Sequence, residues 1–223
     1  LLVHSSFSPL RGTGLPPTEI ISKLLGLVGK AGTLAMPAMP KFRNSANKLN
    51  YLNQDQNFVF EYDVKKSLIK TGLLPTYLHR KNGSVRSAHP INTMVAYGAI
   101  AKELMADNLS GDSPLACGKN SSWKKCIDNN ACIIGLGLDL THSLTMIHVA
   151  EDILDENWPI KNWYKETSFI IKQDGIKKNI KLRERDPKWG ALHFAERTLC
   201  KDLVEQGILF STVIDGVMVE ITN

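Results

Sequence analysis

The sequence contains no long apolar run, and its cysteines are few. No stretch approaches the roughly 20 apolar residues that a membrane-spanning helix needs. Residues 1–14 have no basic region followed by an apolar core of signal-peptide length. The four cysteines, Cys117, Cys126, Cys132 and Cys200, form no C-x-x-C pair. We therefore expect no membrane partner, free thiols and a location in the reducing cytoplasm.

The motifs of several common enzyme classes are absent as well. Neither G-x-G-x-x-G nor G-x-x-x-x-G-K-S/T occurs, which disfavours dinucleotide and P-loop binding. G-x-S-x-G is missing, which disfavours a hydrolase serine. H-E-x-x-H is missing too, and His142 and His148 are six residues apart, so they do not share a helical face. We expect no metal site.

The composition is that of a globular protein with excess positive charge. A length of 223 residues, 43% of them hydrophobic, suits a single domain over 1–223. The net charge of +5 and the pI of about 9.0 indicate an anionic partner. Nucleic acid and a phosphorylated cofactor are both options for such a partner. Because the lysines are scattered and no basic stripe carries aromatic residues, we expect no nucleic acid. The sequence leaves open whether the chain forms a homo-oligomer.

Strand-like and helix-like segments alternate along the chain. Apolar strand-like runs lie at 1–5, 33–38, 131–137, 168–172 and 217–221. Segments with helical periodicity lie at 17–29, 92–107, 143–156 and 190–207. This alternation predicts an α/β fold whose sheet is covered on both faces.

Two parts of the chain depart from this alternation. Residues 161–186 predict a β-hairpin around Asp174 and Gly175, which could extend the sheet with antiparallel strands. The chain has no initiator methionine and opens directly on the strand-like Leu1 to Ser5. From this we expect that an N-terminal segment has been lost.

Thr145, His148 and Glu151 form the sharpest candidate for catalysis. They are spaced three residues apart in a predicted helix, so their side chains share one face. The carboxylate would fix the imidazole tautomer and make the ring a better general base. An ion pair on the helix surface is the alternative.

His89 stands at a second candidate junction. The following Pro90 forces it toward an extended backbone, and we expect Asn92 or Thr93 to cap a helix just after it. Arg86 and Ser87 add charge and a hydroxyl beside it. A plain structural loop is the alternative.

Two polar segments are further candidates for a binding site, and the backbone amides of the first could hold phosphate or pantetheine-like groups. The loop after the first strand, "HSSFSPLRGTG", is rich in hydroxyls and glycines, although it could equally cap the helix that starts near Pro17. The segment "CGKNSSWKK" brings together Lys119, Ser121 and Ser122. An ordinary loop is again the alternative.

Taken in order, six segments resemble the aminoglycoside 3-N-acetyltransferase family, also called the antibiotic N-acetyltransferases. They are "VHSSFSPL", "GTLAMPAMP", "VRSAHPINTMVAYG", "SPLACGKNSSWKK", "IIGLGLDLTHSLTMIHVAE" and "LVEQGILFSTVIDGVMVEI". The resemblance covers nearly the whole chain except the family's opening segment. It implies a three-layer α/β/α fold with a central mixed sheet, unlike the GCN5-related acetyltransferases. It also implies acetyl transfer from acetyl-coenzyme A to a sugar amine, the reaction behind aminoglycoside resistance.

The resemblance also implies residue roles. His148 becomes the catalytic histidine, Glu151 its carboxylate partner and Thr145 a neighbour of the reacting carbonyl. The predicted cofactor-binding residues share a place along the coenzyme A cleft: Ser5, Ser6, Arg86, Ser87, His89, Lys119 and Ser121. The chain departs from the family pattern at Cys117, Ser122, at Ile91 to Thr93 and in the loop after Gly137.

These departures leave the acceptor open. We expect direct transfer in a ternary complex, with an aminoglycoside or related amino sugar as the amine. Asp139, Glu151, Asp152, Asp155 and Glu156 could form an acidic rim for such a polycation. The alternatives are an acetyltransferase for a nucleotide-linked or polysaccharide amino sugar, and a cofactor-binding homologue without turnover.

Overall fold

The computed structural model describes residues 1–42, 59–140 and 143–222, which contain two sheets. The strands are β1 (Leu2–Ser5), β2 (Thr33–Pro37), β3 (Val59–Asp63), β4 (Val85–Arg86), β5 (Met94–Gly98), β6 (Ile133–Leu136), β7 (Tyr164–Gln173), β8 (Ile176–Arg185), β9 (Leu209–Ile214) and β10 (Val217–Thr222). The α-helices are α1 (Phe7–Leu10), α2 (Pro17–Val28), α4 (Leu73–Arg80), α5 (Ala101–Met105), α6 (Ser122–Asp128), α7 (His148–Leu154) and α8 (His193–Glu205).

The larger sheet is mixed. Its strands run in the order β4-β5-β2-β1-β6-β10-β9. β1 pairs in parallel with both β2 and β6, whereas β5 and β10 add antiparallel to the two sides of this parallel centre. The carboxyl ends of the three parallel strands therefore meet at one edge, where α/β proteins commonly bind ligands.

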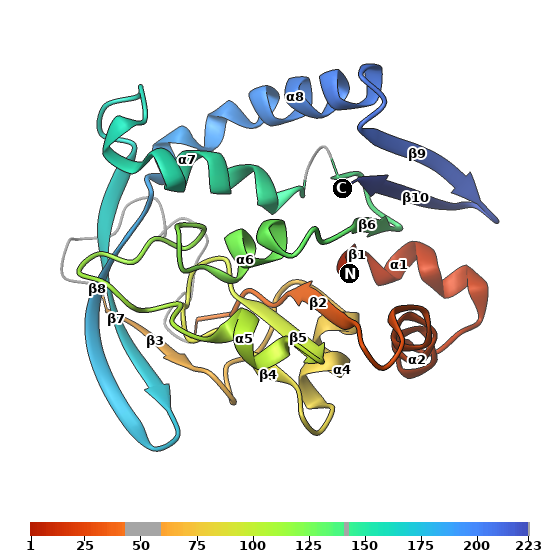
Figure 1. The fold of residues 1–223 in the computed structure, drawn as a ribbon, viewed down its shortest axis with the longest axis horizontal. Helices are drawn as coiled ribbons and strands as arrows, with labels where there is room; N and C mark the ends of the chain where they lie inside the picture. Colours follow the sequence, from red (N-terminus) through yellow and green to blue (C-terminus); the bar gives the residue numbers. More distant parts are fainter. Residues whose placement is uncertain (43–58, 141–142, 223) are drawn as a thin grey trace.

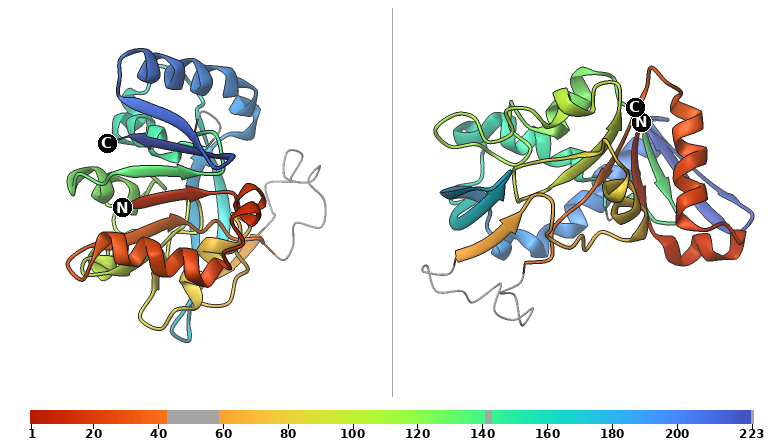
Figure 2. Two further views of the ribbon diagram at one scale, coloured as in Figure 1. Left: turned by 90° about the vertical axis from the view of Figure 1, so that its right-hand side faces the viewer. Right: turned by 90° about the horizontal axis from the view of Figure 1, so that it is seen from below.

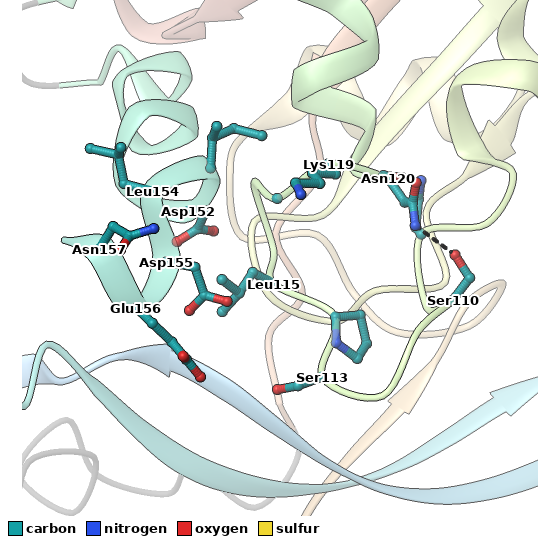
Figure 3. Close-up of a pocket in the computed structure, with 14 residues that line it drawn as sticks. Ser110, Ser113, Leu115, Lys119, Asn120, Asp152, Leu154, Asp155, Glu156 and Asn157 are labelled. Atoms are coloured by element: carbon teal, nitrogen blue, oxygen red, sulfur yellow. Dashed lines mark hydrogen bonds between the residues drawn. The ribbon is translucent and has the colours of Figure 1, made fainter.

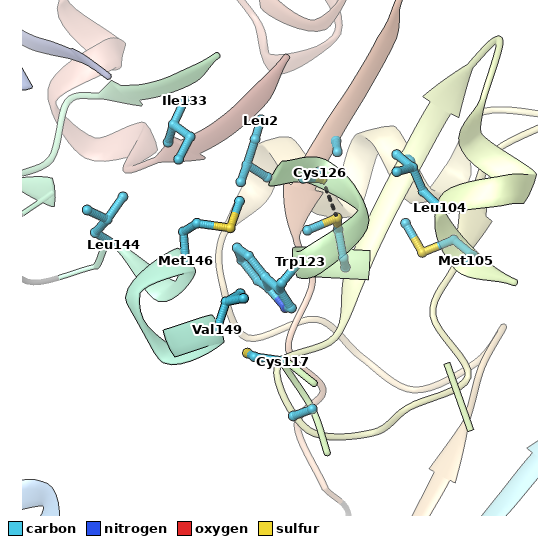
Figure 4. Close-up of a cluster of buried hydrophobic side chains, with 14 of the residues drawn as sticks. Leu2, Leu104, Met105, Cys117, Trp123, Cys126, Ile133, Leu144, Met146 and Val149 are labelled. Carbon is cyan, nitrogen blue, oxygen red and sulfur yellow. Dashed lines mark hydrogen bonds between the residues drawn. The ribbon is translucent and has the colours of Figure 1, made fainter. Parts of the chain in front are cut away.

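Helices cover both faces of this sheet, so the predicted three-layer α/β/α architecture is confirmed (Figures 1 and 2). Leu2 and Val3, adjacent in β1, point to opposite faces and belong to different core clusters. On the face of Val3 the core is completed by Ile20 and Ile21 of α2 and by α4. On the face of Leu2 it is completed by α5, α6 and α7, with Trp123 of α6 at the centre (Figure 4).

The predicted helix over 17–29 is confirmed. Pro17 occupies the first turn of α2, where its missing N–H costs nothing, and Gly29 ends the helix with a φ of 67°. No helix in the described residues is long and apolar enough to cross a membrane.

The predicted helix over 92–107 is wrong in its first half. Met94–Gly98 is strand β5, antiparallel to β2, and only Ala101–Met105 is helical. Asn92 lies in a left-handed turn with a φ of 46° instead of capping a helix, and Thr93 Oγ1 donates to the carbonyl of Pro90 at 2.9 Å. A strand buried on both faces gives a continuous apolar run, which periodicity cannot separate from a buried helix.

The segment 161–186 contains the antiparallel pair β7–β8, with Asp174 and Gly175 at positive φ in the turn. Its expected position as an extension of the main sheet is wrong. β7 instead pairs in parallel with β3, giving a separate sheet in the order β3-β7-β8. Phe60, Tyr62 and Phe169 belong to a separate hydrophobic core, and burial of these side chains stabilises the smaller sheet.

Candidate active site

His148 and Glu151 form a hydrogen-bonded pair at the start of α7. A 3-10 turn over Thr145–Ile147 leads directly into the helix, which places the two side chains one turn apart. His148 Nδ1 lies 3.0 Å from Glu151 Oε1. The two side chains are only 17% and 12% exposed, so this is not a solvated surface ion pair. Because a carboxylate can only accept, Nδ1 carries the proton.

Glu151 has further partners outside its own helix. The indole Nε1 of Trp163 donates to Glu151 Oε2 at 3.2 Å. Arg185 Nη1 lies 3.9 Å from Glu151 Oε1. Both oxygens of the carboxylate are therefore engaged, and Oε1 faces the imidazole. This fixes both the tautomer and the direction of the ring.

The pair faces a cavity of about 160 Å³ between α7 and the smaller sheet, lined also by Asn92, Tyr164 and Arg183. Asp152, next to Glu151 in the chain, lies in the same wall. It accepts hydrogen bonds from the backbone N–H of Cys117 at 2.7 Å and from the Tyr164 hydroxyl at 2.9 Å. Burial raises the pKa of Asp152 above its usual value, and these two donors oppose that shift.

Asp152 also borders a larger cavity of about 380 Å³, shown in Figure 3. Asp155 and Glu156 lie on one side of it and Lys119 on the other. The cavity is therefore lined by charges of both signs. Outside its lining, Arg183 binds Asp155 through two N–H···O contacts of 2.8 Å.

Ser5 and Thr145 meet in a separate cavity of about 260 Å³ at the carboxyl ends of β1 and β2. Thr145 is 9% exposed, and its hydroxyl lies 3.4 Å from the carbonyl of Ser143. His4 lines the same cavity, and burial lowers the pKa of its ring to about 4. Thr145 therefore lines a different cavity from the one that His148 faces.

Ser6 lies just past the end of β1, where its backbone N–H donates to the carbonyl of Leu136 at 2.9 Å. Gly137, the next residue after Leu136, has a φ of 67° and lies close to the backbone of Ser6. A Cβ at Gly137 would lie 2.8 Å from the Ser6 carbonyl oxygen. The two loops after β1 and β6 are thus held together at the edge of the sheet.

The residues at the β4 end are buried. Arg86 is 4% exposed, and its guanidinium donates to the carbonyls of Ser67 and Ala38, each at 2.7 Å. Ser87 Oγ accepts from the backbone N–H of His89 at 3.1 Å. These contacts tie β4 to neighbouring loops, and any part that Arg86 or Ser87 plays in binding a cofactor remains a prediction.

His89 is 2% exposed, and protein groups satisfy both of its ring nitrogens. Nε2 lies 3.3 Å from the carbonyl of Pro114, and Nδ1 accepts from the N–H of Ile91 at 3.2 Å. A neutral ring protonated at Nε2 satisfies both contacts. Burial lowers the pKa of His89 to about 4. Its cofactor-binding role also remains a prediction.

Lys119 and Ser121 differ in exposure. Lys119 is exposed at the rim of the cavity in Figure 3. Ser121 is 3% exposed and caps α6, since its hydroxyl oxygen accepts from the backbone N–H of Lys124 at 3.0 Å. Ser122 donates to Asn108 at 2.9 Å. Only Lys119 of this trio faces open space.

Sequence reasoning missed Trp163, Tyr164 and Arg185, although all three lie beside the His148–Glu151 pair. Trp163 and Tyr164 lie where the β7–β8 hairpin begins in the chain, and Arg185 lies where it ends, so all three are at its base. No local sequence pattern links that hairpin to α7. His142 lies outside the described residues. Within the described part of the chain, no group of three or more His, Cys, Asp or Glu side chains is placed to hold a metal ion.

Residues 2–213 match the sequence model of a family described as aminoglycoside 3-N-acetyltransferase. The chain is 27% identical over 164 residues to aminoglycoside N(3)-acetyltransferase IX of Micromonospora chalcea, covering 70% of this chain and 56% of the relative. It is 28% identical over 158 residues to aminoglycoside N(3)-acetyltransferase III of Serratia marcescens, covering 69% and 57%. The matches thus span little more than half the length of these relatives.

Solved structures of similar proteins share the fold. The structure of AAC-IIIb with CoASH superimposes with a TM-score of 0.76 at 21% identity, covering 99% of this chain and 83% of that chain. Aminoglycoside acetyltransferase AAC(3)-IIb gives a TM-score of 0.75 at 24% identity, covering 100% and 84%. At these identities the likeness establishes the architecture alone.

Proposed function

The chain belongs to the aminoglycoside 3-N-acetyltransferase family, and from that premise we propose that it transfers the acetyl group of acetyl-coenzyme A to an amino group of an aminoglycoside or related amino sugar. Its relatives carry that activity in their names. One similar structure holds CoASH, and another is described as bound to sisomicin. The net charge of +5 also suits an anionic co-substrate.

The hydrogen bond between His148 and Glu151 is the observation that carries the proposal. A neutral imidazole whose Nδ1–H is held by a carboxylate presents Nε2 as its basic nitrogen. Such a group can take a proton from an amine as the amine nitrogen becomes bonded to carbon. The pair lies beside a cavity and is largely shielded from solvent, which is the environment that acid–base catalysis needs.

In the proposed reaction the acetyl group passes directly to the amine. Acetyl-coenzyme A supplies the acetyl group, and its thiol is released. The new N–C bond forms as the C–S bond breaks, His148 accepts the proton that the neutral amine loses, and the leaving thiolate is then protonated by His148 or by solvent. A backbone N–H stabilises the negative charge that develops on the carbonyl oxygen, and Thr145 can take this role only where the bound thioester also reaches the cavity that Thr145 lines. Ser5 shares a cavity with Thr145 and is a proposed contact of the co-substrate near that carbonyl.

The acceptor is proposed to bind where acidic side chains border the cavities on either side of Asp152. Asp152 and Glu156 could each attract a protonated amine. Lys119 lines the same cavity and Arg183 neutralises Asp155, so the rim is less acidic than the sequence suggests. This mixture of charges favours a second candidate as acceptor: an amino sugar that also carries a phosphate, such as a nucleotide-linked one.

Thiol release from acetyl-coenzyme A tests the proposal. We expect release that depends on an added amine, measured across gentamicin, sisomicin, apramycin and nucleotide-linked amino sugars. His148→Ala should lower the rate by about 10²–10⁴, the usual size of a lost general base. Thiol release by His148→Ala at the parent rate would contradict the assigned role. Binding of coenzyme A without release for any amine would identify a cofactor-binding homologue instead.

A further inference from the structure

We propose that Trp163 is a positioning residue for the acetyl transfer: its indole N–H holds the Glu151 carboxylate in the orientation that sets the tautomer of His148. The inference rests on the proposed function in so far as it concerns rate. The structural part of it, the effect of Trp163 on the tautomer of His148, stands apart from any reaction.

The carboxylate of Glu151 is held from two sides by donors on different elements. Oε1 faces His148 Nδ1 at 3.0 Å, within α7. Oε2 accepts from Trp163 Nε1 at 3.2 Å, just before β7. Rotation about the last side-chain bond of Glu151 would break both contacts together, so the indole N–H opposes the rotation that would release the imidazole.

Trp163 is itself firmly placed. It is 5% exposed, and its ring stacks on Trp189 with centroids 5.6 Å apart at an angle of 24°. The ring of Trp158 also packs against the Trp163 ring, with centroids 5.4 Å apart at an angle of 51°. The Trp163 carbonyl accepts from the backbone N–H of Asp186 at 2.9 Å, which closes the base of the β7–β8 hairpin.

This base lies next to α7 in Figure 1, at the end of the ribbon away from its turn. The Tyr164 hydroxyl bonds Asp152 of α7 at 2.9 Å, which confirms the contact between hairpin and helix. Through Trp163, which directly precedes β7, the smaller sheet supplies the N–H donor that orients Glu151 and His148.

An indole suits this position better than a cation would. It donates one hydrogen bond and carries no charge, so it orients Glu151 without neutralising it. Arg185 lies farther away, at 3.9 Å from Oε1. A second cation in place of the indole would compete more strongly with His148 for the negative charge of Glu151.

Three tryptophans of one cluster provide a matched experiment. Trp163→Phe removes the N–H that binds Glu151. Trp189→Phe removes an N–H that donates to the carbonyl of Asn162 at 3.0 Å. Trp158→Phe removes a buried N–H that has no hydrogen-bond partner in the described part of the chain. The chemical change is the same in all three variants, and only the first touches the carboxylate.

Two measurements separate positioning from packing. We expect Trp163→Phe to lower kcat about tenfold, with KM for both substrates within about twofold, because an outer contact of a catalytic group is lost. By ¹⁵N NMR, the fraction of His148 protonated at Nδ1 should fall in Trp163→Phe. Both controls should match the parent in kcat and in tautomer, and melting curves establish that all variants are folded.

Parent values of kcat and tautomer in Trp163→Phe would overturn the proposal. An equal loss of kcat in Trp158→Phe or Trp189→Phe would also overturn it, since the cluster would then act through packing alone. A parent protein without transferase activity would refute the proposed function. A tautomer shift confined to Trp163→Phe would still support the positioning role in that case.

Discussion

His89 and His148 both lie at junctions between secondary-structure elements, but the environments of their rings are opposite. The ring of His89, between β4 and β5, is 2% exposed and contacts the backbone of Ile91 and Pro114. The ring of His148, at the start of α7, is held by the carboxylate of Glu151 and lines a cavity. Sequence reasoning assigned both to the site. Backbone partners stabilise a neutral ring and leave it no reactive nitrogen, whereas a carboxylate partner prepares a ring for proton transfer.

We expect the largest effect on stability from Arg86, whose buried guanidinium donates to backbone carbonyls. Arg86→Met should lower the free energy of unfolding by about 3 kcal/mol, because the buried carbonyl of Ala38 and the partly buried carbonyl of Ser67 lose their donor. Urea unfolding followed by circular dichroism measures this. Arg80→Met, on the exposed end of α4, is the control and should change the value by less than about 0.5 kcal/mol. Full stability in Arg86→Met combined with a raised KM for acetyl-coenzyme A would show instead that this junction binds the co-substrate.

The pH dependence of stability tests whether the His89 ring is buried in its neutral form. The folded-state pKa of His89 is lowered from 6.5 to about 4, so the unfolded chain binds the proton first as the pH falls. Stability is therefore complete above pH 6.5 and is lost as the pH falls toward 4. Between pH 7.5 and pH 5 the loss should be about 2 kcal/mol for this ring.

His4, whose pKa is likewise about 4, should contribute a similar loss over the same range. Urea unfolding at the two pH values measures the sum in the parent. In His89→Gln the difference between the two pH values should shrink by about 2 kcal/mol. A difference that does not shrink would mean that His89 is not buried as a neutral ring.

The smallest effect concerns the contact between α7 and the hairpin. Tyr164→Phe removes the hydroxyl that donates to Asp152 and should destabilise the fold by about 1.5 kcal/mol, the usual size for a hydrogen bond to a charged group. Differential scanning calorimetry measures it, with Tyr97→Phe on β5 as the control. Equal melting of Tyr164→Phe and the parent would indicate that the hairpin and α7 are not coupled through Asp152.

The main sheet was largely predictable because its parallel strands are short apolar runs with turn residues at their ends. β1, β2 and β6 follow that pattern, and α2 carries the proline and glycine of a regular helix. β5 was mistaken for a helix because burial on both faces removes the alternation that marks a strand. Gly98 at its end has a φ of 135°, and a Cβ there would lie 2.3 Å from the Gly32 carbonyl oxygen. That close approach is invisible in the sequence.

The candidate site likewise has one part that the sequence predicts and another that only the tertiary structure shows. His148 and Glu151 are three residues apart, so helical geometry alone brings them together. Trp163 and Arg185 reach Glu151 only because the hairpin returns to α7, a contact that depends on tertiary packing. Arg86 and His89 look like ligand-binding residues by type, but burial and backbone contacts decide what each can do.

The most direct test of the account compares thiol release by His148→Ala and His89→Gln, each corrected for its folded fraction, with acetyl-coenzyme A and an acceptor amine at saturation. We predict that His148→Ala loses about 10²–10⁴ in kcat, whereas His89→Gln, whose ring is a predicted contact of the cofactor and takes no part in proton transfer, stays within about threefold of the parent in kcat. A His89→Gln variant as inactive as His148→Ala, or a fully active His148→Ala, would contradict it.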